Sequence, residues 1–214
     1  MKYHKLVENA KKPNGFWGKM MIKAMNKGHS SLTSWGLEHM NIERTATVLD
    51  IGCGGGKTVD RLCSIVANGK VYGIDYSELS VKSSKKLNSK NILCNKAKIL
   101  QASVSDMPFD DNTFDNITAV ETYYFWPDKE NDVKEVFRVL KQGGTVMLLF
   151  EMLRTDDDPF KWEKVENMLN IKSVTPQEIR FVLESAGFEN INTYTKEGTT
   201  WLCATAQKPK DDEN

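Results

Sequence analysis

Apolar and polar positions along the chain alternate between short strand-like runs and longer stretches with helical spacing. The strand-like runs are residues 47–51, 70–75, 99–104, 116–120 and 145–150, and helical spacing is found at 58–67, 81–88, 132–140, 160–169 and 176–186. Two further runs, 189–194 and 199–206, flank the turn Lys196-Glu197-Gly198 and predict an antiparallel pair. Strands that alternate with helices indicate an α/β fold with a mostly parallel sheet.

The N-terminal segment is unusually apolar for a stretch outside this pattern. Residues 16–27 predict one helix, Gly28 is a stop signal, and a second short helix is predicted from Ser30 or Ser31 to Met40. We therefore expect three parts: residues 1–43 as a helical lid or cap, 44–208 as the main domain, and 209–214 as a disordered tail. Trp17 and Met21 are predicted to contact a substrate under the lid. A cap packed on the sheet edge and a homodimer contact explain the same apolar surface, and periodicity does not choose between them.

A glycine-rich loop follows the first predicted strand in the sequence Val48-Leu-Asp-Ile-Gly-Cys-Gly-Gly-Gly-Lys-Thr58. Glycine is needed where φ is positive or where a ligand approaches the backbone, so this loop predicts a binding site. A phosphate-binding P-loop would need glycine where Ile51 stands, and a dinucleotide fingerprint would need its third glycine where Lys57 stands. The spacing here is G-x-G-x-G, on Gly52, Gly54 and Gly56.

Acidic residues end several of the predicted strands. Asp50 lies in the first strand, and Asp75 ends the second, about twenty residues after the glycine loop, where nucleoside-binding α/β folds place the acid that binds the ribose hydroxyls. Glu121 follows the fourth strand and precedes four aromatic residues, 123–126. Ligands of open α/β sheets bind outside the carboxyl ends of the strands. We therefore predict that these acids surround one site and that Tyr123, Tyr124 and Trp126 belong to the substrate pocket, with about half of the four rings packed in the core.

Composition and charge narrow the functional classes. The 214 residues are 40% hydrophobic, and 29 basic residues balance 29 acidic ones, so the broad positive charge of a nucleic-acid-binding protein is absent. Cys53, Cys63, Cys94 and Cys203 form no C-x-x-C pair, and no histidine has zinc-ligand spacing, so no metal site is predicted. No signal peptide and no membrane span are predicted. A cytoplasmic protein with a small-molecule partner is expected.

The glycine loop and the segments after it resemble the class I S-adenosylmethionine (SAM)-dependent methyltransferases. V-L-D-I-G-C-G-G-G is similar to motif I of that family, Met107-Pro108-Phe109 stands in place of its L-P-F segment, and the residues 138–144, R-V-L-K-Q-G-G, are similar to its link before the fifth strand. The resemblance covers residues 46–208 in family order. It is strongest to small-molecule enzymes typified by the ubiquinone and menaquinone biosynthesis methyltransferases, which carry the type 11 methyltransferase domain. It implies a Rossmann-like fold with a mostly parallel seven-stranded sheet, a C-terminal antiparallel hairpin and an N-terminal helical lid.

The resemblance also implies a cofactor and a set of contacts. SAM would bind and leave as S-adenosylhomocysteine, with its methionine part on the loop that carries Gly52, Cys53, Gly54 and Gly56. Asp50 would anchor the ammonium group, and Asp75 with Tyr76 would hold the ribose. The family acid that binds adenine is replaced by Ser103, and Ser103 with the Val104 amide is expected to read the adenine edge. Glu121 would lie beside the cofactor.

The chemistry implied is in-line transfer of a methyl group to a small-molecule acceptor. A hydroxyl acceptor would need a general base, and Glu121 and His29 are the candidates. Two rivals remain at this point: a SAM-binding scaffold without activity, and a nicotinamide-dependent oxidoreductase, which would need the glycine that Lys57 replaces.

Overall fold

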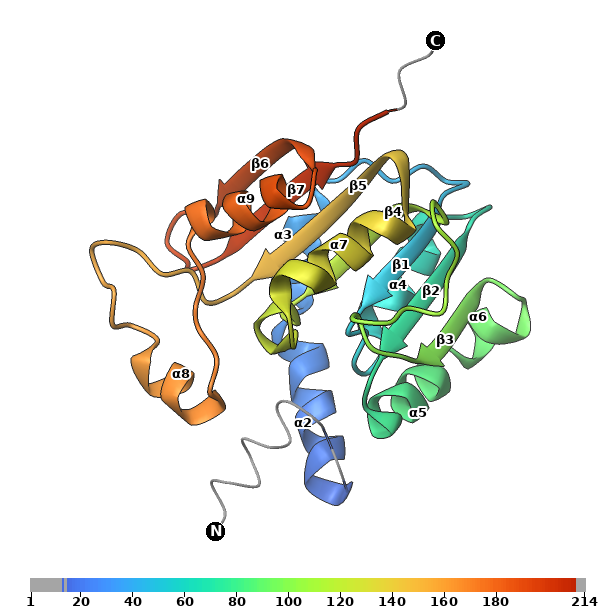
Figure 1. The fold of residues 1–214 in the computed structure, drawn as a ribbon. Coiled ribbons are helices and arrows are strands. Elements are labelled where there is room, and N and C mark those ends of the chain that lie inside the picture. The colour runs from blue at the N-terminus through green and yellow to red at the C-terminus, as the bar shows by residue number, and fades with distance from the viewer. Residues whose placement is uncertain (1–12, 14, 211–214) are drawn as a thin grey trace.

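A twisted seven-stranded sheet organises the part of the chain that the computed structural model describes, residues 13 and 15–210 (Figure 1). The strands are β1 (Thr47–Ile51), β2 (Lys70–Asp75), β3 (Ala97–Gln101), β4 (Phe114–Val120), β5 (Leu140–Phe150), β6 (Glu189–Thr195) and β7 (Leu202–Gln207), in the order β3-β2-β1-β4-β5-β7-β6. Strands β1 to β5 are parallel, and β7 is antiparallel to both β5 and β6. The predicted fold class is confirmed.

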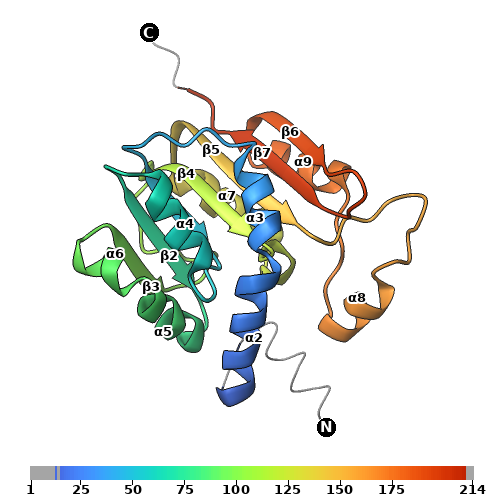
Figure 2. The ribbon, with the colours of Figure 1, turned by 180° about the vertical axis from the view of Figure 1, so that it is seen from behind.

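Helices cover both faces of the sheet, as Figures 1 and 2 show from opposite sides. One face carries α3 (Ser30–Leu37), α4 (Lys57–Ile65), α5 (Glu78–Leu87) and α6 (Ser89–Leu93), and the other carries α7 (Lys129–Val139) and α9 (Pro176–Ser185). Helix α2 (Gly15–Gly28) lies beyond the carboxyl ends of the parallel strands, and α8 (Glu163–Leu169) extends to one side. A short 3₁₀ helix, η1 (Tyr123–Phe125), follows β4. Residues 1–12 and 14 of the predicted cap (1–43) and residues 211–214 of the predicted tail (209–214) lie outside the described residues.

The central strands are apolar because helices cover them on both sides. In β1, Val48 packs into the core under α4 and Leu49 into the core under α7, and both are fully buried.

Ser77 caps α5 by accepting a hydrogen bond from the Ser80 amide, as its place before the helix predicts. Thr175 and Glu178 form a capping box at the start of α9.

Strands β1 and β2 have the predicted ranges, and among the strands that differ, β3 and β5 change how neighbouring segments are assigned. β3 ends at Gln101, because its last residue pairs with Asp75, where β2 also ends, so Ser103 and Val104 lie in the turn after the strand. β5 begins at Leu140 rather than 145, because Leu140 already pairs with Phe114 of β4. Lys141–Gly144, which the sequence places in the link before the fifth strand, therefore belongs to the strand itself.

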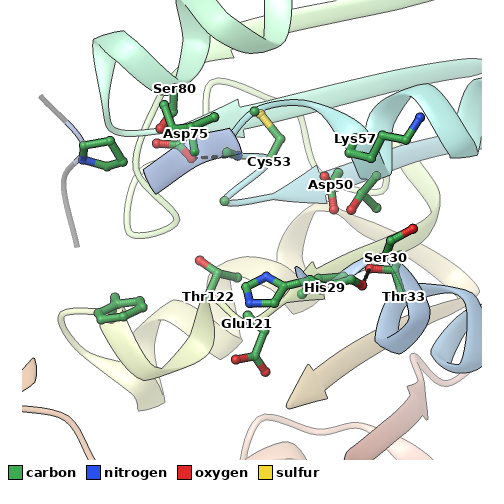
Figure 3. Close-up of a pocket in the computed structure, with 18 of the residues that line it drawn as sticks. His29, Ser30, Thr33, Asp50, Cys53, Lys57, Asp75, Ser80, Glu121 and Thr122 are labelled. Atoms are coloured by element: carbon green, nitrogen blue, oxygen red, sulfur yellow. Dashed lines mark hydrogen bonds between the residues drawn. The ribbon is translucent and has the colours of Figure 1, made fainter. Parts of the chain in front are cut away.

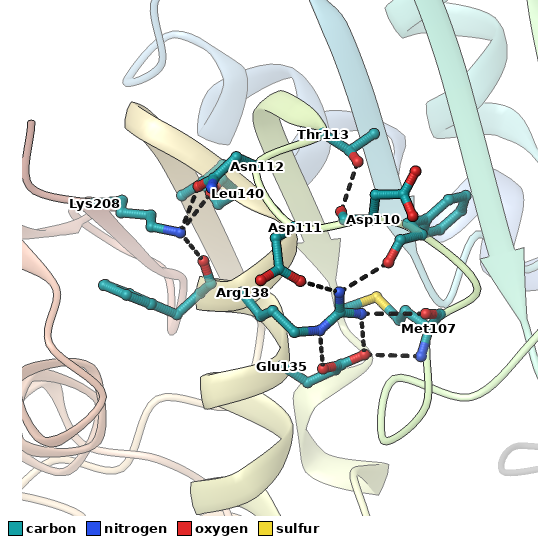
Figure 4. A network of polar contacts seen from close by, with 11 residues as sticks. Met107, Asp110, Asp111, Asn112, Thr113, Glu135, Arg138, Leu140 and Lys208 are labelled. Atoms are coloured by element: carbon teal, nitrogen blue, oxygen red, sulfur yellow. Dashed lines mark hydrogen bonds and ion pairs between the residues drawn. The ribbon is translucent and has the colours of Figure 1, made fainter. Parts of the chain in front are cut away.

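Arg138 of α7 fastens the loop between β3 and β4 to the body of the protein (Figure 4). Its guanidinium donates to the carbonyl oxygens of Met107 (3.3 Å) and Phe109 (2.8 Å) and pairs with Glu135 and Asp111, each at 2.7 Å. Because one rigid cation satisfies two carbonyls and two carboxylates, this network fixes geometry as well as charge. Arg138, the first residue of the R-V-L-K-Q-G-G segment, thus has a structural role: it holds the loop between β3 and β4 against α7.

The structure also bears on the expectations about membrane spans and cysteines. Within them, no helix has both the length and the apolar composition that crossing a membrane requires. Cys53, Cys63, Cys94 and Cys203 are all unpaired thiols, and only Cys94 is exposed.

Candidate functional site

A cavity opens at the carboxyl ends of β1, β2 and β4, under α2 and the start of α3. The chain runs from β1 towards β3 on one side and from β4 towards β5 on the other, so β1 and β4 form the switch point where ligands of such sheets bind. The empty space is about 890 Å³, a figure that includes open solvent at the mouth. Of the residues predicted from sequence, the cavity is lined by His29, Asp50, Gly52, Cys53, Gly54, Asp75, Tyr76 and Glu121.

The glycine loop takes a conformation that only glycine adopts easily. Gly52, Gly54 and Gly56 have φ of 67°, 50° and 83°. A Cβ on Gly52 would lie 2.2 Å from the hydroxyl oxygen of Thr122, whereas the nearest atom to a Cβ on Gly54 would be 3.9 Å away. The loop is therefore pressed against the β4 side at Gly52 and is open to the cavity at Gly54.

Asp75 holds this loop in place. Its carboxylate accepts hydrogen bonds from the amides of Gly54 (2.9 Å) and Ser77 (2.8 Å), and the residue is 8% exposed. Burial raises the pKa of Asp75, and the two amide hydrogen bonds oppose that shift. The carboxylate is thus positioned at the cavity wall before any ligand arrives.

Asp50 is more deeply buried, at 2% exposed. The hydroxyl of Thr118 on β4 donates to one of its oxygens at 2.7 Å. Burial raises the pKa of Asp50 to about 7, the hydrogen bond from Thr118 lowers it, and the charge of Asp75 adds to the increase. Asp50 consequently changes charge near neutral pH in the absence of a cationic ligand.

Glu121 has an unusual backbone for a residue other than glycine, with φ of 57°. Such a left-handed conformation costs roughly 1–2 kcal/mol, and it persists because the Glu121 amide is bonded to the carbonyl of Leu149 and its carboxylate accepts the amide of Glu151. Burial of the carboxyl group raises the pKa of Glu121 to about 8, with a further contribution from the charge of Glu151. Strain of this kind, held by neighbouring groups, is typical of functional sites.

His29 enters the cavity from the connection between α2 and α3, far from the sheet in sequence. Its carbonyl accepts hydrogen bonds from the amide (2.8 Å) and hydroxyl (2.7 Å) of Thr33. Arg61 of α4 donates to both the carbonyl and the hydroxyl of Ser30, each at 3.0 Å. Burial lowers the pKa of His29, which keeps its imidazole neutral. Figure 3 shows His29 and Glu121 close together, across the cavity from Asp75.

The aromatic run after β4 is mostly structural, which corrects the predicted substrate pocket. Tyr123, Tyr124 and Trp126 are 3%, 5% and 6% exposed, belong to the main core, and do not line the cavity. The rings of Tyr123 and Tyr124 pack edge-on against Phe150, and the Tyr124 hydroxyl accepts the Met152 amide at 2.9 Å. Phe125, which was not selected from the sequence, is the ring of this run that lines the cavity.

Other predicted contacts also lie outside the cavity lining. Trp17 is 51% exposed, and the neighbouring Ile22 rather than Met21 reaches the cavity. Ser103 lies in the turn after β3, where its hydroxyl accepts the Ser105 amide, and Val104 is buried in the core. Gly56 does not line the cavity, and it faces Ser84 of α5 on the other side of the loop.

Several cavity residues were missed by sequence reasoning: Pro13, Ile22, Ser30, Thr33, Lys57, Thr58, Arg61, Ser80, Thr122 and Phe125. Lys57 and Thr58 open α4 directly after the glycine loop, so their positions could have been inferred from the motif. Thr122 and Phe125 follow β4 at the strand end that the sequence had already assigned to the site. Pro13, Ile22, Ser30 and Thr33 come from the N-terminal segment, whose position over the sheet the sequence left open.

The chain is similar to known methyltransferases. Residues 49–148 match the family model described as "Methyltransferase domain". The chain is 27% identical over 183 residues to the uncharacterized methyltransferase YdaC of Bacillus subtilis, covering 85% of this chain and 93% of that protein. It is 29% identical to the ubiquinone/menaquinone biosynthesis C-methyltransferase UbiE of Cronobacter sakazakii, covering 73% and 72%. It also matches fungal sterol 24-C-methyltransferases, but spans only 28% to 30% of their length.

The fold has solved counterparts as well. A SAM-dependent methyltransferase from Aquifex aeolicus superposes with a TM-score of 0.68 at 21% identity, covering 87% of this chain and 96% of that chain. At this level of identity the likeness concerns the fold.

Proposed function

Because this chain is a class I SAM-dependent methyltransferase, we propose that it transfers the methyl group of SAM to a small-molecule acceptor bound between Glu121 and the N-terminal segment. The observation that carries this proposal is the cavity itself. Its sheet side presents the glycine loop and two buried acids, and its other side is lined by Ile22, His29 and Phe125. A cavity with walls on both sides suits a small acceptor better than a polymer.

In the proposed complex, the sheet side holds the cofactor. Asp75 accepts hydrogen bonds from the ribose hydroxyls, because its carboxylate is buried, already oriented and open to the cavity. The methionine carboxylate lies at the start of α4, where Lys57 and Thr58 line the cavity and free amides favour an anion. Asp50 receives the ammonium group. The demethylated product, S-adenosylhomocysteine, would keep these contacts.

The N-terminal segment then acts as the lid over the acceptor. It is tied to the sheet domain on two sides of the cavity: the Ser77 hydroxyl donates to the carbonyl of Pro13 at 3.1 Å, and Arg61 binds Ser30. Side chains from this segment and from the end of β4 would surround the acceptor and exclude water.

The transfer is a direct displacement. The bond between sulfur and the methyl carbon breaks, its electron pair goes to sulfur, and a lone pair of the acceptor forms the new bond to carbon. Sulfur in SAM is already positively charged, so alignment of donor and acceptor supplies most of the acceleration. A hydroxyl acceptor also loses its proton, which passes to water at the open mouth of the cavity.

Calorimetry followed by turnover tests the proposal. We expect the protein to bind SAM and not NADH, and to release S-adenosylhomocysteine with at least one member of a panel of phenols, hydroxylated quinone rings, sterols, amines and thiols. The quinone and sterol members reflect the names of the relatives matched above. Tight SAM binding without product from any member would favour a SAM-binding scaffold, and binding of NADH alone would favour an oxidoreductase.

SAM binding is also expected to depend on pH through Asp50. The free protein holds Asp50 protonated below its pKa of about 7, and the ammonium group binds only the ionised form. Between pH 6 and 7.5 the dissociation constant should therefore fall by about eightfold. Calorimetry across this range checks the slope. The Asp50→Asn variant should bind SAM more weakly and lose this pH dependence, and a slope that persists in the variant would assign it to another group.

A further inference from the structure

His29, Glu121 and Glu151 form a cluster of metal-binding side chains at the acceptor side of the cavity. They come from the α2–α3 connection, the end of β4 and the end of β5. One ligand atom from each residue lies within 4.8 Å of the other two. Ligands at about 2.1 Å from one cation lie about 3–3.5 Å apart, so a shift of about 1 Å would bring the three atoms to ligating distance.

The charges in this cluster are not balanced by the protein. Glu121 and Glu151 are neighbours whose side chains repel each other. Among the described residues, neither forms an ion pair with lysine or arginine. A cation bound between them would therefore stabilise the ionised forms of both carboxyl groups, which repel each other in its absence.

The backbone keeps the cluster assembled. Glu121 holds its left-handed conformation, and its carboxylate accepts the amide of Glu151, so the two strand ends are joined. Arg61 secures Ser30, next to His29, from the cofactor side. Glu151 is exposed, which gives an ion a route from solvent, while His29 and Glu121 face the cavity.

We propose that His29, Glu121 and Glu151 bind a divalent transition-metal cation, which holds an oxygen atom of the acceptor beside the methyl donor. One nitrogen and two carboxylate ligands suit Mn²⁺, Fe²⁺, Co²⁺ or Zn²⁺ better than Mg²⁺, which favours oxygen alone. Three protein ligands leave positions open for water or for a hydroxyl or phenolic oxygen. His29 and Glu121 then serve as ligands instead of the general bases expected from sequence. The identity of the acceptor ligand rests on the proposed function, but the cation site does not.

Titration with Mn²⁺ alone tests the site, because Mn²⁺ prefers nitrogen and oxygen ligands and avoids the four free thiols. The full chain without SAM should bind one Mn²⁺, measured by calorimetry and by loss of the free-ion paramagnetic resonance signal. Glu151→Gln and His29→Ala should each weaken binding at least about tenfold. Glu163→Gln, which changes an exposed glutamate of α8, is the matched control and should bind like the native chain.

The outcomes separate this site from the proposed function. Glu151 does not line the cavity, so Glu151→Gln should keep SAM affinity within about threefold of the native value, which also shows that the variant is folded. Equal Mn²⁺ binding by the native chain and Glu151→Gln, or no Mn²⁺ binding by a native chain that binds SAM, would overturn the cation site alone. Failure of the native chain to bind SAM would instead count against the proposed function.

Discussion

Replacing Asp75 with alanine is expected to weaken SAM binding by at least tenfold, which is about 1.4 kcal/mol. The carboxylate is buried at the end of β2 and, in the proposed complex, accepts the ribose hydroxyls. Its removal also leaves the amides of Gly54 and Ser77 without their acceptor, so the glycine loop loses an anchor. Calorimetry with SAM measures the effect.

Two comparisons make the Asp75 result specific. Asp157→Ala removes a carboxylate from an exposed loop and should leave SAM affinity unchanged. Thermal unfolding of Asp75→Ala without SAM shows how much of the loss comes from the loop rather than from the ribose contact. If the variant binds SAM as tightly as the native chain, Asp75 does not belong to the cofactor site.

Gly56→Ala is expected to destabilise the protein more than Gly54→Ala, although both glycines have positive φ, of 83° and 50°. Each alanine substitution lowers the free energy of unfolding by roughly 1–2 kcal/mol, because alanine is strained in the left-handed conformation. At Gly56 the new Cβ would also lie 2.3 Å from the hydroxyl oxygen and 2.9 Å from the Cα of Ser84, and 2.5 Å from the side-chain nitrogen of Asn88. Relieving this contact must move α5, which adds about 1–3 kcal/mol.

Urea unfolding without SAM provides the measurement. Gly54 is the matched control because a Cβ there meets nothing closer than 3.9 Å. The expected order of the free energy of unfolding is native, then Gly54→Ala, then Gly56→Ala. Equal losses in the two variants would mean that the contact between the loop and α5 does not constrain position 56.

The part of the site that lies within one short stretch of the sequence could be predicted. The G-x-G-x-G loop, Asp50 and Asp75 lie within 26 consecutive residues, 50–75, and each lies at or just after the carboxyl end of a strand whose direction the pattern already indicates. The structure places all three at one cavity. Their roles towards SAM remain predictions that the variants above test.

The part assembled from distant segments could not be predicted. His29, Glu121 and Glu151 are separated by 92 and 30 positions, so no spacing motif joins them, and they meet only because the α2–α3 connection lies over the ends of β4 and β5. Burial of Tyr123 and Tyr124 also depends on long-range packing, since both rings pack edge-on against Phe150 of β5. Hydrophobicity marks these rings as buried but does not say whether a core or a ligand covers them.

The antiparallel direction of β7 has a practical consequence for handling the protein. Gln207, at the end of β7, pairs with Thr145 of β5, and the next residue, Lys208, forms backbone hydrogen bonds with Gly143 and Gly144 towards the start of β5. The chain therefore leaves the sheet at the edge opposite the cavity. Pro13 lines the cavity itself. A fluorophore or surface tether attached near Lys210 would therefore leave the cavity mouth clear, whereas one attached near Pro13 would obstruct it.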